Sequence, residues 1–149
     1  MKQWAQIHAA EFYEALGSRY IMYGEWMYAK HSIFYDALPS YFMEFDILDR
    51  ETGRFLDTRL RHEMTASMPI SSVPVLAEGT FERKEDLLKL LRTSNYITPR
   101  HIEKLRSYAE ANGLDPDRQC RETDPSDLME GLYIKIEEGG EVARRMKFR

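Results

Sequence analysis

Apolar and aromatic runs typical of β-strands lie near both ends of the 149-residue sequence, and helical or polar segments lie between them. The expected strands are Tyr20–Tyr28, Tyr41–Leu48, Gly131–Glu137 and Glu141–Phe148, with a short segment around Phe55 and Leu56. Gly139-Gly140 separates the last two strands and is typical of a tight hairpin turn. Because the strands cluster at the two ends and do not alternate regularly with helices, the sequence predicts an α+β domain.

Helices are predicted at three places. Apolar residues recur at helical spacing over Lys2–Leu16, and Gly17 supplies a stop. Thr98-Pro99 offers an N-cap hydroxyl followed by a proline at the first helical position, so a helix is expected from there to Asn112. The other expectations are a helix over Glu82–Arg92 whose Leu87–Leu91 stripe belongs to the core, a turn over Asp49–Gly53, loops over Met64–Pro74 and Leu114–Ser126, and at most a short edge strand over Val73–Leu76.

Composition excludes several classes of protein. The length fits one domain, and 43% hydrophobic residues is too many for a disordered chain. No apolar run approaches the roughly 20 residues that cross a bilayer, and the N-terminus lacks the core of a signal peptide. The single Cys120 excludes an internal disulfide and a cysteine-based zinc site, and a solvated or half-buried thiol is favoured over a reactive one. We therefore expect a cytoplasmic domain with a mild net charge of 21 − 25 = −4.

The first strand carries a carboxylate inside an apolar run. A carboxylate on a half-buried strand needs a partner, so Glu25 either pairs with an interior cation or faces a polar cavity. A position on the solvent face of an antiparallel strand explains the same pattern equally well. Gly24 precedes Glu25, and a glycine inside a strand often marks a bulge or a place where a ligand approaches the backbone.

Two further stretches combine polar and strand-forming residues. In a regular strand, Glu44 and Asp46 fall on one face and Phe45 on the other, although an ordinary amphipathic strand has this pattern too. In the stretch from Glu130 to Lys135, Gly131 lets a ligand come close to the backbone beside Glu130. Each stretch alone is a weak signal for a site.

Together, and followed by the basic segment 144–149, the three stretches resemble the later motifs of the covalent nucleotidyltransferases. The block from Tyr23 to Asp46 resembles most closely the ATP-dependent RNA ligase family, and the resemblance extends from about Lys2 to Arg149. It implies the antiparallel-sheet fold of a ligase adenylation domain. It also implies an activity, the joining of RNA ends with ATP through enzyme-AMP and RNA-adenylate intermediates.

The resemblance implies roles for individual nucleotide-binding residues. Gly24 and Glu25 match the motif whose glutamate binds the ribose, and Phe45 matches the aromatic residue that stacks on adenine, an interaction that suits any base. Glu130 and Lys135 match the Glu-Gly-x-x-x-Lys motif, whose glutamate helps to hold the α-phosphate and a divalent metal. Mg²⁺ or Mn²⁺ is implied, because both prefer hard oxygen ligands.

The resemblance assigns the remaining catalytic cations to the C-terminal strand. Arg145 and Lys147 match the final motif, whose positive charges neutralise the phosphates during group transfer. The family often has lysine at both positions, so Arg145 is a departure that keeps the charge and changes the geometry of the donors.

One motif of the family is absent from the 149 residues. The nucleophilic lysine belongs to a Lys-x-Asp-Gly motif that precedes Tyr23 by several strands, and the sole Lys-x-Asp, at Lys84, is followed by Leu87. We therefore interpret residues 1–149 as the later two-thirds of a nucleotidyltransferase domain, N-terminally incomplete and inactive in self-adenylation by itself. The alternative is a non-catalytic module that binds a nucleotide or RNA. Because the missing N-terminal strands would leave sheet edges without a partner, the 149 residues are also expected to self-associate.

Other polar residues carry weaker predictions. Lys30 and His31 are expected either near the RNA and nucleotide phosphates or as ordinary surface residues. Arg54, Arg59 and Arg61 are expected either along a phosphate path or, more simply, in a solvated charged loop. Metal binding is not expected of the scattered histidines His8, His62 and His101.

Overall fold

A computed structural model describes residues 2–30 and 32–148 of the chain, which form two compact units. Unit 1 contains residues 2–27, Ser40–Pro74 and Tyr133–Phe148, and unit 2 contains Tyr28–Pro39 and Val75–Leu132. The structure is α+β with antiparallel sheets, which confirms the predicted class. No helix in the described part of the chain is both long and apolar enough to cross a membrane.

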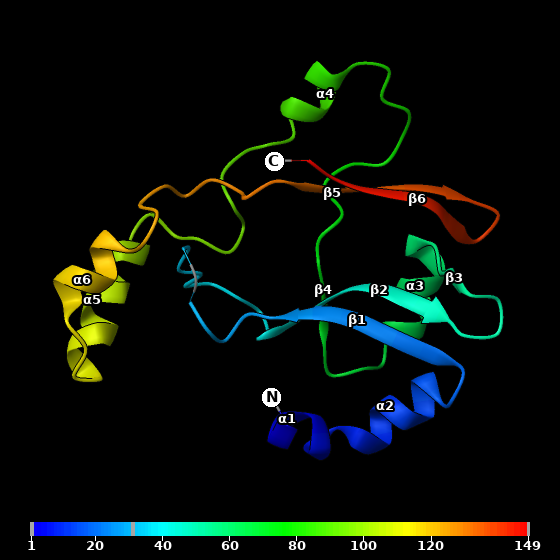
Figure 1. Cartoon of the computed structure of the whole chain (residues 1–149), viewed down its shortest axis with the longest axis horizontal. Coiled ribbons are helices and arrows are strands. Elements are labelled where there is room, and N and C mark those ends of the chain that lie inside the picture. Colours follow the sequence, from blue (N-terminus) through cyan, green and yellow to red (C-terminus); the bar gives the residue numbers. More distant parts are fainter. Residues whose placement is uncertain (1, 31, 149) are drawn as a thin grey trace. The chain divides into compact units, whose positions relative to one another are not determined.

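The sheet of unit 1 is built on the two predicted N-terminal strands (Figure 1). Strands β1 (Tyr20–Trp26), β2 (Phe42–Asp49) and β3 (Arg54–Phe55) pair antiparallel in that order, and β4 (Ser71–Ser72) pairs parallel with β2. Strands β1, β2 and β3 and the turn before β3 were predicted from the sequence, whereas β4 lies inside the predicted loop 64–74. An edge strand over residues 73–76 was wrong: the Val73 N–H still bonds to the Glu44 carbonyl at 2.8 Å, but Pro74 has no N–H to continue the ladder.

Two short helices precede the sheet, where the sequence predicted one. Helix α1 (Lys2–Ile7) ends at His8, whose backbone leaves the helical region, and α2 (Ala9–Leu16) follows directly. The ring of Trp4 lies 5.5 Å from that of Trp26 and 5.7 Å from that of Phe42. These helices therefore cover the face of β1 and β2 on which Trp26 and Phe42 lie.

The C-terminal hairpin is confirmed. Strands β5 (Leu132–Glu138) and β6 (Glu141–Phe148) form a two-stranded sheet. Gly139 and Gly140 join them with φ of 61° and 86°, a left-handed conformation that favours glycine at both positions. The Gly140 carbonyl accepts the Asp57 N–H at 2.9 Å. The turn is therefore attached to the start of a helix that begins at Thr58, earlier in the chain.

That helix, α3 (Thr58–Thr65), was missed, and its end falls inside the predicted loop 64–74. Asp57 is its N-cap, and the carboxylate accepts the Leu60 N–H at 2.7 Å. The capping residue was the available signal in the sequence. The core between these elements of unit 1 includes the buried Met43 and Ile47.

Unit 2 contains three helices among its described residues: α4 (Lys84–Leu88), α5 (His101–Ala111) and α6 (Pro116–Arg121). The predicted helix over residues 82–92 is confirmed only over the five residues of α4. Leu88 is 44% exposed, so the interpretation of the leucine stripe as core was wrong. Buried side chains of unit 2 include Ile97 and Leu105.

The start of α5 and the presence of α6 differ from the expectations for this region. Thr98 does not cap α5, because its N–H and hydroxyl both bond to the Asp36 carboxylate, at 2.7 and 2.5 Å. The helix begins three residues later. Helix α6 lies in the predicted loop 114–126. Asp115 is its N-cap and Pro116 is its first residue, a position at which proline is favourable.

Candidate functional site

A β-bulge lies in the middle of β2, at one of the motifs singled out from the sequence. Tyr23 pairs with Asp46 and Gly24 pairs with Glu44, so Phe45 is an extra residue without a partner on β1. Consecutive residues of a strand point to opposite faces, and paired residues share a face. Asp46 and Glu44 therefore point to opposite faces of the sheet, and the expectation that they share one was wrong.

Gly24 is required at this bulge for packing. The ring of Phe42 and the Met43 carbonyl occupy the space that a Cβ at Gly24 would fill. The expected bulge is confirmed, and the group that approaches this glycine in the structure is a neighbouring side chain.

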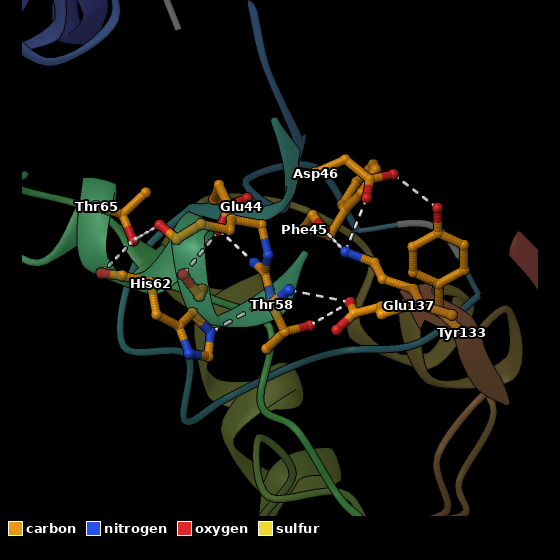
Figure 2. Close-up of polar contacts among 11 residues, drawn as sticks. Glu44, Phe45, Asp46, Thr58, His62, Thr65, Tyr133 and Glu137 are labelled. Carbon is orange, nitrogen blue, oxygen red and sulfur yellow. Dashed lines mark hydrogen bonds and ion pairs between the residues drawn. The ribbon is translucent and has the colours of Figure 1, made fainter. Parts of the chain in front are cut away.

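On one face, Asp46 accepts contacts from three donors of the C-terminal hairpin, of which Figure 2 labels Tyr133. Asp46 is 1% exposed. The Tyr133 hydroxyl donates to it at 2.6 Å, Lys135 Nζ lies 2.8 Å from Oδ1, and an Arg145 nitrogen donates to Oδ2 at 2.9 Å. We call these four residues the Asp46 cluster. One carboxylate is shared by two cations, so the cluster carries a net positive charge.

The electrostatics of the cluster keep Asp46 ionised. Burial raises the pKa of Asp46, but the contacts from Lys135 and Tyr133 outweigh it, and the pKa lies below its ordinary value. Burial and the bond to Asp46 raise the pKa of Tyr133 to about 12, so this hydroxyl keeps its proton. Burial lowers the pKa of Arg145, and the bond to Asp46 more than compensates, so Arg145 stays charged.

Phe45 lies beside the cluster. Its ring meets that of Tyr133 edge-on, with the centroids 5.9 Å apart, and it is half-buried. Lys135 Nζ also donates to the Phe45 carbonyl at 2.5 Å. The structure therefore brings together three predicted site residues: Phe45 and Lys135, predicted for nucleotide binding, and Arg145, predicted as a catalytic cation.

Lys147 follows Arg145 by two residues on β6, so both point to the same side of the strand. It is exposed, and it makes no hydrogen bond or ion pair within the described part of the chain. Arg145 is partly exposed, and its guanidinium lies 3.7 Å above the centroid of the Phe55 ring. Lys147 is thus a cation that an anionic ligand can reach, and it lies beside Arg145, which Asp46 and Phe55 already hold in place.

On the opposite face, Glu44 and Arg61 form a buried ion pair. Arg61 donates to Glu44 Oε2 at 2.5 Å, and the Ser72 hydroxyl donates to the same oxygen at 2.7 Å. The two side chains are 0% and 3% exposed. We call Glu44 and Arg61 the Glu44 pair. Both expectations for Arg61, a phosphate path and a solvated loop, were wrong, because its cation is removed from solvent.

The other two arginines of that prediction lie on the surface. Arg59 forms an exposed ion pair with Glu63 at 2.8 Å, and Arg54 forms one with Glu141. These contacts support the solvated alternative.

Helix α3 connects the two faces. Its Arg61 binds Glu44 on one face. Its first residue, Thr58, donates its N–H and hydroxyl to Glu137 Oε1 on β5 at 3.0 and 2.7 Å (Figure 2). Glu137 lies two residues after Lys135, on the same side of the strand. The sequence patterns predicted neither helix α3 nor the position of Tyr133 beside the Asp46 carboxylate.

Glu25 and Glu130 are the other carboxylates predicted for the site. Glu25 is exposed on β1 and makes no polar contact among the described residues. Glu130 belongs to unit 2, where it is exposed and accepts the Tyr35 hydroxyl at 2.9 Å. It also lines a pocket with Ser32 and Asp124. Within residues 2–30 and 32–148, no group of three or more His, Cys, Asp and Glu residues that could hold a metal ion is found.

The remaining polar candidates have structural partners. Lys30 Nζ donates to the Thr123 hydroxyl at 2.9 Å, and the prediction for His31 lies outside the described residues. His8 lies 3.5 Å from Glu11, His62 lies 3.3 Å from Arg61, and His101 Nδ1 lies 2.9 Å from the Thr98 carbonyl.

Comparison with known proteins gives one result. The family model described as RNA ligase matches residues 1–149. No curated protein and no solved structure matches the chain significantly.

Proposed function

The chain belongs to the RNA ligase family, and we propose that unit 1 binds the phosphates of ATP and of RNA ends on the face that carries the Asp46 cluster. On this proposal the chain has the nucleotidyltransferase fold of a ligase adenylation domain. Its substrates are ATP and RNA ends.

The charge balance of the Asp46 cluster carries the proposal. Lys135 and Arg145 supply two positive charges and Asp46 supplies one negative charge, which leaves 2 − 1 = +1, and the exposed Lys147 lies beside Arg145 on β6. The whole chain has a formal net charge of −4, so this local excess is not a consequence of composition. A local positive potential attracts anionic ligands and stabilises phosphate charge during group transfer.

Further roles are proposed for residues of each unit. Phe45 stacks on the adenine, and Gly24 and Glu25 lie against the ribose. In unit 2, Glu130 is proposed as an oxygen ligand of a Mg²⁺ or Mn²⁺ ion. A single protein carboxylate is compatible with such an ion, because Mg²⁺ is usually held by one or two carboxylates together with phosphate oxygens and water. The bound ion would neutralise phosphate charge.

The isolated chain is proposed to bind ATP without reacting with it. The 149 residues contain no Lys-x-Asp-Gly motif, and Lys84, in the one Lys-x-Asp, lies in α4 of unit 2. The missing motif also favours a second candidate, a non-catalytic module that uses the same face only for binding. The two candidates differ in whether a nucleophilic lysine is supplied from outside these residues.

Calorimetric titration with ATP and Mg²⁺ tests the binding site. Lys147→Gln and Arg145→Gln are expected to weaken ATP binding by about tenfold each, since a hydrogen bond to a charged group is worth about 1.5–3 kcal/mol. Arg144→Gln is the matched control, because Arg144 is exposed on the same strand and points to the other side. Equal losses in all three variants would indicate non-specific attraction and contradict the proposal.

Labelling separates binding from chemistry. The chain is incubated with ATP labelled at the α-phosphate and run on a denaturing gel. No covalent label is expected, and a labelled band would overturn the account of the missing nucleophile. Size-exclusion chromatography tests the predicted self-association, which a stable monomer at all concentrations would contradict.

A further inference from the structure

Two aromatic side chains of unit 1 flank the Asp46 cluster and have no role in the proposed ATP site. Tyr23 lies on β1 opposite Asp46, and Phe55 lies on β3. The centroids of the two rings are 5.6 Å apart, with the ring planes tilted by 53°. The Arg145 guanidinium covers the Phe55 ring at 3.7 Å. The three side chains therefore form one continuous group of planar surfaces.

Tyr23 and Arg145 give this group an exposed surface, Phe55 beneath Arg145 is half-buried, and the group is held in place. Tyr23 is 39% exposed, and so is the Arg145 side chain. Arg145 cannot rotate freely, because Asp46 binds it at 2.9 Å and Phe55 lies against it. A planar group that is fixed before binding loses little conformational entropy when a ligand stacks on it.

We propose that Tyr23, Phe55 and Arg145 form a stacking platform for a base of single-stranded RNA. Unpaired RNA bases stack on tyrosine rings and on guanidinium planes, and such stacking tolerates any base. The inference rests on the proposed function, because it places the RNA beside the cations that are proposed to hold phosphates. It names a contact that the assigned motifs do not include.

The charges around the platform favour a nucleic acid strand as its occupant. Lys147 points to the same side of β6 as Arg145, about 7 Å further along the strand. A base on the platform therefore has a free cation near the position of a neighbouring phosphate. Phe45, proposed for the adenine of ATP, packs against Tyr133, which leaves the Tyr23 ring for a second base.

The test compares RNA binding by Tyr23 variants. The probe is a fluorescent, 5′-phosphorylated ten-nucleotide oligouridylate, measured by anisotropy at one fixed salt concentration. Tyr23→Ala is expected to bind about tenfold more weakly, as stacking on an aromatic side chain is worth about 1–3 kcal/mol per base. Tyr23→Phe keeps the ring and should restore binding. Tyr13→Ala is the matched control, because Tyr13 is 74% exposed on α2, and it should bind like the parent chain.

A second variant tests the guanidinium. Arg145→Lys keeps the charge and removes the planar group, so RNA binding should fall although the positive charge remains. Thermal unfolding of each variant identifies any that has lost its fold. Because Tyr23 is 39% exposed, Tyr23→Ala should lose only part of its packing and unfold within a few degrees of the parent chain.

Parallel ATP titrations distinguish the possible failures. Weaker RNA binding with unchanged ATP binding by Tyr23→Ala supports the platform. Weaker ATP binding with unchanged RNA binding would mean that the ring stacks on adenine, and it would overturn the RNA assignment. Unchanged binding of both by Tyr23→Ala overturns the platform and leaves the proposed function standing. A parent chain that binds no RNA overturns both, whereas one that binds RNA but no ATP overturns only the proposed ATP site.

Discussion

The two faces of β2 use a buried carboxylate in opposite ways, although Glu44 and Asp46 are only two residues apart. Glu44 has one cationic partner, Arg61, and both are removed from solvent. Asp46 is equally buried, but it is shared by Lys135 and by Arg145, which reaches the solvent. The first face is balanced in charge and closed, and the second has an excess of cations and is open.

The difference indicates that burial of a charge does not by itself identify a binding site. A balanced, buried pair has no charge to offer a ligand, and its removal is expected to affect folding. A carboxylate shared by two cations, such as Asp46, holds both cations in position but neutralises only one of their two charges. The remaining positive charge can attract an anionic ligand. The following predictions test this contrast in order of expected effect.

Breaking the Glu44 pair should have the largest effect on stability. Arg61→Met leaves the Glu44 carboxylate buried without a cation, which typically costs about 3–5 kcal/mol of unfolding free energy. Urea denaturation measures the loss. The double variant Glu44→Leu with Arg61→Met should recover most of it, since apolar residues can replace a buried ion pair. Arg59→Met, on the exposed side of the same helix, is the control and should change stability by less than about 0.5 kcal/mol. A double variant as unstable as the single one would contradict the interpretation.

Neutralising Asp46 should cost less. Asp46→Asn leaves two cations without their shared carboxylate, but both lie nearer to solvent than Arg61 does. We expect a loss of about 2–3 kcal/mol, in line with hydrogen bonds to charged groups. Urea denaturation again gives the value. A loss larger than that of Arg61→Met would reverse the proposed contrast between the faces.

Tyr133→Phe should have a smaller effect that depends on pH. Removing the hydroxyl donor to Asp46 should cost about 1.5 kcal/mol at neutral pH. The pKa of Tyr133 is raised to about 12, so the folded chain holds this proton more tightly than the unfolded chain, whose tyrosine titrates near 10. This contribution is complete below about pH 10 and is lost as the pH rises toward about 12. Thermal unfolding across that range should bring the variant and the parent chain closer together, and a constant difference would contradict the assignment.

The contact between α3 and β5 should contribute least to stability. Glu137→Ala removes the acceptor for Thr58, and because this carboxylate is exposed the loss should stay below about 1 kcal/mol. Glu63→Ala, which breaks an exposed pair on the same helix, is the matched control. If α3 aligns the hairpin with the sheet, Glu137→Ala should weaken ATP binding more than Glu63→Ala does. Equal ATP affinities in calorimetry would count against that alignment.

Local sequence patterns predicted the elements that local physics decides. The two central strands and the hairpin with its Gly-Gly turn follow from strand-forming residues and from glycines at positive φ. The helices α3 and α6 were missed because their signals are single capping residues, Asp57 and Asp115, and α6 was obscured by a proline that also occurs in loops. The leucine stripe Leu87–Leu91 was wrongly assigned to the core, because helical spacing of leucines does not show whether another element packs against them.

The sequence by itself determined the family, the α+β class and the residue types available for phosphate binding, because these depend on motifs and on short-range preferences. Only the tertiary structure decided which carboxylate meets which cation. One extra residue, Phe45, sends Asp46 and Glu44 to opposite faces, and their partners lie far along the chain, on β5 and β6 for Asp46 and on α3 for Glu44. The alternation of polar and apolar residues along a strand does not reveal a bulge. It also contains no information on contacts between residues that are nearly one hundred positions apart.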